Sequence, residues 1–270
     1  MRAPFHSRSS PLPCSSSEVQ WSVAMESRPS VSTRHSLPFL GHRYTRRSNT
    51  TTPDKNNART KAREGTAVLY PSDIFGLPHL ENKLLADSYA RAGYLTVAPD
   101  LFAGAPFSGD PNAPGLNTSA FLALHTPVVT DPIVATAIAY LRSELGVTRI
   151  AAPGYCFGGR YTFRALAAGG GVDVWYAAHP SLLEASEIAA IAGPVSVAAG
   201  ERDVLFGPAA RVEAEAVLAN GSQAYQVSLY SGTQHGFAVR ADLNDEGQRW
   251  AKEQAFLQAV RWFDRFFCQG

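Results

Sequence analysis

Cysteine is scarce in this 270-residue chain, and its distribution excludes two common uses of the residue. The three cysteines, Cys14, Cys156 and Cys268, are odd in number, lie far apart and form no CxxC or His/Cys spacing. Neither a disulfide scaffold nor a zinc site fits this pattern. We therefore expect no metal site, and a reducing compartment such as the cytoplasm, where a lone thiol survives.

Long apolar runs are also missing, because no stretch reaches the roughly 18 consecutive apolar residues of a membrane-spanning helix. The formal net charge is only +1, but the charges are unevenly distributed. Residues 1–64 hold 11 Lys/Arg and 4 Asp/Glu, whereas residues 65–270 hold 13 and 19. Since the longer segment is net negative, it would not attract polyanions. We expect neither a membrane nor a nucleic acid as a partner.

Residues 1–64 lack a sustained apolar period and contain 18 Ser/Thr together with many Pro and Arg. This composition predicts a largely disordered extension. A mitochondrial transit peptide is one alternative, although Glu18 and Glu26 interrupt the pattern. An atypical start of the folded domain is another. The segment has no apolar core of a secretory signal, so secretion is not predicted.

Residues 65–270 are predicted to form one α/β domain. Apolar runs alternate there with amphipathic segments, which is typical of βαβ units around a mostly parallel central sheet with helices on both faces. The predicted strands are Thr66–Ser72, Tyr94–Pro99, Val147–Pro153, Val172–Ala178, Pro194–Ala199 and Ala224–Ser231. The predicted helices are Leu80–Ala92, Pro132–Leu145, and residues 157–168, 207–219 and 247–267. Loops that follow the strands should meet along one rim of the sheet.

The sharpest motif is Gly154-Tyr155-Cys156-Phe157-Gly158-Gly159, between a predicted strand and a predicted helix. It has the G-x-nucleophile-x-G pattern, with Cys in place of Ser. Such a turn strains the nucleophile's backbone, and its neighbours must be small because strand and helix nearly touch. The helix N-terminus also favours a thiolate. The alternative is a buried structural cysteine flanked by incidental glycines.

A nucleophile of this kind requires a base and a residue that orients the base, and in this fold class the chain order is nucleophile, acid, histidine. Asp203 follows the predicted strand Pro194–Ala199, and His235 follows the predicted strand Ala224–Ser231. Of the seven histidines, only His235 comes after Asp203. The alternatives are that Asp203 caps the next helix and that His235 is an ordinary loop histidine.

Five segments in order resemble the dienelactone hydrolase family, and most closely its fungal branch. They are Ser72–Gly76, Ala98–Phe102, Gly154–Gly159, Ala178–Ser181 and His235–Arg240. The resemblance covers about Gly65 to Phe267. It implies a single α/β-hydrolase domain that needs no metal or organic cofactor and acts on lactones or small esters. By position it makes Cys156 the nucleophile, His235 the base and Asp203 the residue that orients the base.

The same resemblance assigns supporting roles. Backbone amides of Ile74 and Phe157 match the oxyanion hole. Asp73 stands where family members carry an acid, typically Glu, that helps to deprotonate the thiol. Asp is one methylene shorter, and capping of the following turn is the alternative role. Arg240 matches a cation that meets a substrate carboxylate. Arg160 is a second candidate for that role, with a surface charge as its alternative.

The main departure from the family lies at the start of the chain. Family members open with a strand pair before the strand that leads to Asp73, and residues 1–64 offer only faint candidates such as Leu37–Tyr44. Either the early strands are degenerate or the domain is shortened.

Taken together, these features predict a monomeric or homodimeric hydrolase that cleaves small-molecule esters or lactones through a Cys-His-Asp triad and an acyl-enzyme. The alternatives are a lyase, isomerase or cyclase that uses the same pocket, and a non-catalytic protein with a redox-sensitive thiol.

Overall fold

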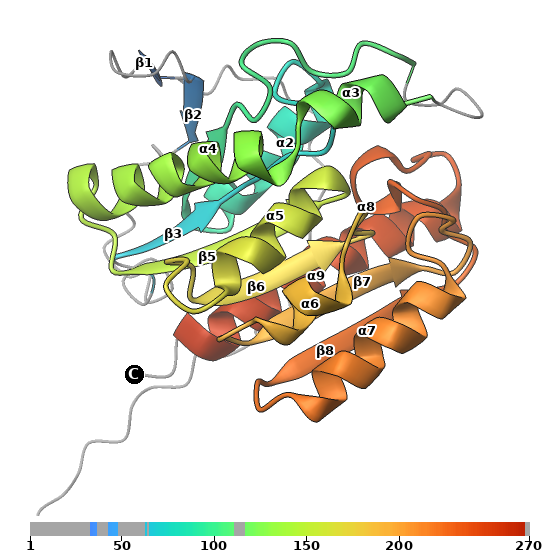
Figure 1. The fold of residues 1–270 in the computed structure, drawn as a ribbon. Coiled ribbons are helices and arrows are strands. Elements are labelled where there is room, and N and C mark those ends of the chain that lie inside the picture. Colours follow the sequence, from blue (N-terminus) through green and yellow to red (C-terminus); the bar gives the residue numbers. More distant parts are fainter. Residues whose placement is uncertain (1–32, 37–42, 48–62, 64, 111–116, 268–270) are drawn as a thin grey trace, which may run out of the picture.

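The computed structural model describes residues 33–36, 43–47, 63, 65–110 and 117–267. These residues form a sheet of eight strands in the order β1-β2-β4-β3-β5-β6-β7-β8, with helices on both faces (Figure 1). The predicted α/β fold with a mostly parallel sheet is therefore confirmed. None of the helices in these ranges is long and apolar enough to cross a membrane.

Six parallel strands form the body of the sheet, and each overlaps a strand predicted from the sequence. Their bounds are β3 Thr66–Leu69, β4 Leu95–Pro99, β5 Arg149–Tyr155, β6 Val174–Ala178, β7 Val195–Gly200 and β8 Tyr225–Tyr230. Apolar residues occupy both faces of the inner strands, because helices cover each side of the sheet. The carboxyl ends of these strands therefore lie along one rim, as expected.

The longer helices also follow the predicted pattern. They are α2 Leu80–Arg91, α4 Pro127–Ala139 with the π-helical turn η1 Tyr140–Glu144, α5 Phe157–Leu166, α7 Pro208–Asn220 and α9 Glu246–Phe267. The helix expected from Pro132 begins earlier, at Pro127, so Pro132 lies inside it. Three short helices were not predicted, because they are too short to show a 3.6-residue period. They are α3 Ser119–Leu124, α6 Ala185–Ala189 and α8 Phe237–Arg240.

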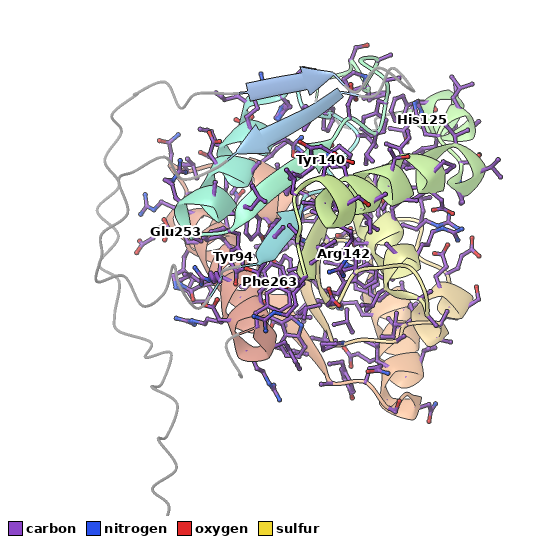
Figure 2. All side chains as sticks on the ribbon, turned by 90° about the vertical axis from the view of Figure 1, so that its left-hand side faces the viewer. Tyr94, His125, Tyr140, Arg142, Glu253 and Phe263 are labelled. Carbon is purple, nitrogen blue, oxygen red and sulfur yellow. The ribbon has the colours of Figure 1, made fainter. Side chains whose placement is uncertain are left out.

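Two hydrophobic cores lie on opposite faces of the sheet. Successive residues of β5 alternate between them, since Ile150 packs into the core beneath α4, α5 and α7, and Ala151 packs into the core beneath α2 and α9. Figure 1 shows α4, α5 and α7 in front of the sheet and α9 behind it. Tyr94 and Phe263, labelled in Figure 2, belong to the second core and meet edge to face at 6.1 Å between ring centroids.

Two short strands extend the sheet beyond β4. β1 (Thr33–Ser36) pairs antiparallel with β2 (Arg43–Arg47), and β2 pairs antiparallel with β4. The disorder expected for residues 1–64 does not hold for these two segments, and the faint candidate Leu37–Tyr44 overlaps β2 at Arg43 and Tyr44. Both strands are short and polar in sequence, so they lack the alternation that identifies a strand. The rest of residues 1–62 lies outside the described residues.

Candidate active site

Cys156 lies in a strained turn between β5 and α5, as the motif predicts. Its backbone φ is 53° and its ψ is −115°, in a region that costs a non-glycine residue about 1–3 kcal/mol. The side chain is buried and belongs to the core in front of the sheet. A strained backbone at the first turn of a helix holds the sulfur where the helix N-terminus stabilises a thiolate.

The glycines of the motif are required by close backbone contacts. A Cβ on Gly154 would lie 2.6 Å from the carbonyl oxygen of Gly158. A Cβ on Gly158 would lie 2.3 Å from the carbonyl oxygen of Pro71 and 2.7 Å from that of Ser72. The loop that follows β3 therefore packs directly on the turn that carries Cys156.

The two amides expected to form an oxyanion hole belong to the two segments that pack together here. Ile74 follows β3 on that loop, and Phe157 is the first residue of α5. Within the described residues, neither N–H donates to another backbone or side-chain group. Amides without an acceptor are available to bind a developing negative charge, and the oxyanion-hole role of these two stays a prediction.

Asp203 and His235 form the second half of the site. The Nδ1–H of His235 donates to the Asp203 carboxylate, with distances of 2.9 Å to Oδ2 and 3.0 Å to Oδ1. Burial would raise the pKa of Asp203, but His235 and the amides of Leu205 and Phe206 outweigh it and hold that pKa below its ordinary value. Asp203 thus orients His235 and also shapes the turn before α7. The Nε2 of His235 has no hydrogen-bond partner among the described residues.

Cys156 and His235 interact electrostatically. Burial alone would raise the pKa of the Cys156 thiol, but the neighbouring His235 lowers that pKa overall. Burial would likewise lower the pKa of His235, but the Cys156 thiolate and Asp203 raise it to about 10. Each group therefore favours the charged form of the other. The sulfur also lies 3.8 Å from the hydroxyl oxygen of Ser181.

Asp73 is fully buried and held by three groups. It forms an ion pair with Arg240, accepts a hydrogen bond of 2.7 Å from Asn82 Nδ2, and accepts another of 3.0 Å from the Phe75 amide. The last contact is the turn cap proposed as its alternative role. The charge of Asp73 raises the pKa of Cys156, and the charge of Arg240 lowers it. Asn82 was not predicted, although a buried amide in α2 is the kind of residue that fixes a carboxylate.

Arg240 and Arg160, both predicted to bind substrate, have carboxylate partners in the structure. The guanidinium of Arg240 pairs with Asp73 and lies over the ring of Phe75, 4.7 Å from its centroid. Arg160 forms ion pairs with Glu184 and Glu187 of the α6 region. The charge of Arg160 is thus already compensated. Its role in binding substrate stays a prediction, as does that of Arg240.

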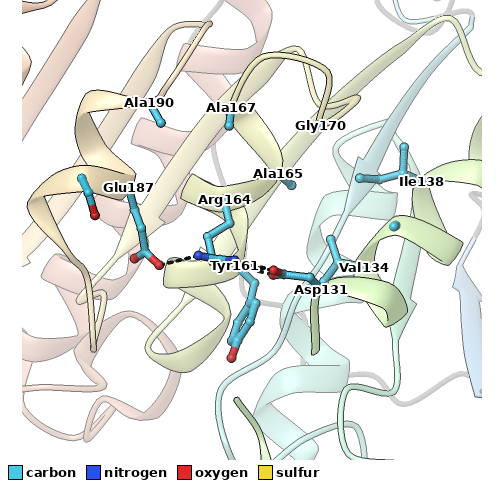
Figure 3. Close-up of a pocket in the computed structure, with 12 residues that line it drawn as sticks. Asp131, Val134, Ile138, Tyr161, Arg164, Ala165, Ala167, Gly170, Glu187 and Ala190 are labelled. Carbon is cyan, nitrogen blue, oxygen red and sulfur yellow. Dashed lines mark hydrogen bonds and ion pairs between the residues drawn. The ribbon is translucent and has the colours of Figure 1, made fainter. Parts of the chain in front are cut away.

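A cavity of about 440 Å³ lies between α4, α5 and α6, outside the triad (Figure 3). Arg164 crosses it and forms ion pairs with Asp131 on one side and Glu187 on the other. None of the three predicted triad residues lines this cavity.

Comparisons with known proteins identify the family of this chain. The model of the dienelactone hydrolase family matches residues 55–267. The hydrolase pyvD of Aspergillus violaceofuscus is 46% identical over 200 residues, which cover 74% of this chain and 81% of that protein. Dienlactone hydrolase 1 of Gibberella moniliformis is 31% identical over 211 residues, which cover 76% and 80%.

The fold is also similar to that of a solved bacterial protein. A putative dienelactone hydrolase from Klebsiella pneumoniae superposes with a TM-score of 0.66 at 18% identity, over 89% of this chain and 99% of that one. At this identity the similarity concerns the fold alone. The family match and the fungal relatives go further, because they cover most of the chain in sequence. The chain therefore belongs to the dienelactone hydrolase family.

Proposed function

We propose that this protein hydrolyses small carboxylic esters or lactones through an acyl-enzyme on Cys156. The observation that carries the proposal is the geometry of the site: Cys156 lies on a strained turn at the start of a helix, and Asp203 holds the His235 imidazole by Nδ1. A nucleophile, a base and a residue that orients the base are the minimal set for acyl transfer.

In the first step the Cys156 thiolate attacks the substrate carbonyl carbon. A C–S bond forms, and the carbonyl π electrons move onto the oxygen, where the Ile74 and Phe157 amides donate hydrogen bonds. When the oxyanion collapses, the ester C–O bond breaks and the Nε2–H of His235 protonates the departing alkoxide. The product is a thioester on Cys156. With a lactone the ring opens, and the freed alcohol remains part of the acyl group that is bound to Cys156.

In the second step water attacks the thioester. Neutral His235 takes a proton from that water through Nε2, while Asp203 stabilises the imidazolium that forms. The same two amides stabilise the second oxyanion. Collapse breaks the C–S bond, releases the carboxylic acid product and returns the thiolate–imidazolium pair. Asp203 is not protonated at any stage.

Family membership favours hydrolysis over the two alternatives considered from the sequence. A lyase, isomerase or cyclase would use the nucleophile without a water-activation step, and a redox-sensitive thiol would require neither His235 nor Asp203. The hydrogen bond between these two residues therefore supports the hydrolytic role.

The proposal is tested with a panel of short p-nitrophenyl esters and small lactones. We expect wild-type protein to turn over at least one class, and Cys156→Ala to reduce kcat/KM on the order of 10³-fold or more. Cys268→Ala, which removes a thiol far along the chain from the motif, should retain wild-type rates. If Cys156→Ala hydrolyses the same substrates as fast as wild type, the proposed nucleophile is wrong.

A further inference from the structure

His179 is a buried histidine that the proposed mechanism does not use. It follows β6 directly, its residue is fully buried, and neither of its ring nitrogens has a hydrogen-bond partner among the described residues. A buried polar group without a partner is costly. A polar ring kept in such a place requires an explanation.

The backbone of His179 is constrained as well. Its φ is +38°, a left-handed conformation that costs most residues free energy and that histidine and asparagine adopt more readily. Backbone hydrogen bonds tie its segment to the turn that carries Cys156. The Cys156 amide donates to the Ala178 carbonyl at 3.2 Å, and the Ser181 amide donates to the Cys156 carbonyl at 3.2 Å. A third bond, 2.8 Å from the His179 amide to Ala198 O, ties it to β7.

The imidazole of His179 packs against that of His235. Their ring centroids are 5.0 Å apart and their planes meet at 71°, an edge-to-face arrangement. The rings of Phe237 and Tyr155 also pack near the His179 ring, with centroid distances of 5.7 and 6.0 Å. Among the described residues, only Asp203 forms a hydrogen bond with the His235 ring, through Nδ1. The His179 ring beside it therefore limits rotation of the imidazole about that hydrogen bond.

We propose that His179 is a positioning residue for the catalytic histidine: its fully buried ring fixes the plane of the His235 imidazole so that Nε2 faces the Cys156 sulfur. The inference rests on the proposed function, because it assigns His235 as the base. It adds a residue that touches neither substrate nor the reacting atoms.

The charge of His179 is consistent with this role. Burial, followed by the positive charges of His235 and Arg240, lowers the pKa of His179 well below its ordinary value. A neutral ring can lie against the His235 imidazolium without repelling it. The other titratable groups around the pair are Cys156, Asp203, Asp73 and Tyr155.

The test follows the rate of Cys156 alkylation by iodoacetamide against pH, with the modified peptides separated by mass spectrometry. This readout reports the thiolate and does not depend on finding a substrate. His179→Asn removes the ring but keeps a residue that tolerates positive φ. In this variant we expect the acidic limb of the alkylation rate against pH to move upward by about one pH unit. A His235 ring that has rotated out of place stabilises the Cys156 thiolate less. His179→Phe, which restores a planar ring, should return the limb toward the wild-type position.

The decisive comparison is a double-mutant cycle with His235→Ala. If His179 acts through His235, adding His179→Asn to His235→Ala changes the limb no further. The inference is overturned if His179→Asn shifts the acidic limb as far in the His235→Ala background as in wild type. It is also overturned if His179→Asn alone leaves the limb unshifted, or if His179→Phe shifts it as far as His179→Asn does. Failure of the proposed function is a separate result, because wild type would then alkylate with the same coupling and hydrolyse no ester or lactone.

Discussion

At the scale of single residues, Gly158 is a position where the fold leaves no room for a side chain. An added Cβ would lie 2.3 Å from a backbone oxygen of Pro71, and backbone does not move aside as a flexible side chain does. We expect Gly158→Ala to lower the free energy of unfolding by about 3 kcal/mol or more, measured by denaturant titration.

Gly169→Ala is the matched control. Gly169 has φ +84°, and an added Cβ there meets nothing within 4 Å, so the substitution adds only backbone strain of about 1–2 kcal/mol. If both alanine variants lost the same stability, close contact between the β3 loop and α5 would not explain the glycine in the motif.

Replacing Asp73 and replacing Arg240, which form an ion pair, should shift the pKa of Cys156 in opposite directions. The Asp73 charge raises the pKa of Cys156 and the Arg240 charge lowers it. We therefore expect Asp73→Asn to shift the acidic limb of Cys156 alkylation to lower pH, because the thiolate then forms more readily. Arg240→Gln should shift that limb to higher pH.

This experiment also separates two roles of Asp73. If Asp73 deprotonates the thiol, as the family resemblance implies, Asp73→Asn should make the thiolate harder to form and shift the limb to higher pH. That outcome would contradict the electrostatic account. Because Asp73 is buried and paired, Asp73→Asn also leaves Arg240 without its partner, so folding is to be checked by circular dichroism in parallel.

At the scale of elements, Arg63 and Asp264 connect the chain before β3 to the last helix, α9. The buried side chain of Arg63 donates to both carboxylate oxygens of Asp264, through Nε at 3.0 Å to Oδ1 and through a terminal nitrogen at 2.6 Å to Oδ2. The hydroxyl of Tyr94 donates to the same carboxylate at 2.7 Å. Removal of the Asp264 carboxylate would leave the charge of Arg63 buried without this ion pair.

We expect Asp264→Ala to lower the free energy of unfolding by about 3–5 kcal/mol, since Arg63 is fully buried. Glu81→Gln breaks the more exposed pair with His79 and should cost about 1 kcal/mol or less. The comparison uses urea unfolding under one buffer condition. Equal losses would mean that the Arg63 contact does not tie α9 to the sheet.

The elements that the sequence predicts are those with a clear period or a buried run. The six parallel strands lie in a sheet with helices on both faces, so apolar runs in the sequence are enough to identify them. β1 and β2 escape prediction because they are short and polar, and because β2 joins the sheet by pairing with β4, which is distant in the sequence, while β1 pairs with β2. Short helices such as α6 escape for a related reason, because one or two turns show no periodicity.

At the scale of the whole molecule, chain order alone brings the predicted triad partners together. Loops after parallel strands share one rim, so Cys156 after β5, Asp203 after β7 and His235 after β8 converge there. Asn82 and His179 could not be assigned roles in this way, because each acts through a contact with a residue remote in sequence. The carboxylate partners of Arg160 likewise depend on how α6 packs on α5.

The most direct test of the central claim is to trap the acyl-enzyme. Protein mixed with p-nitrophenyl acetate is quenched with acid during turnover, digested and mapped by mass spectrometry. If Cys156 forms an acyl-enzyme, we expect one acetyl group on the peptide that contains Cys156. It should form in a burst and be absent from Cys156→Ala. Hydrolysis with no acetyl on that peptide, at a rate that Cys156→Ala leaves unchanged, would contradict it.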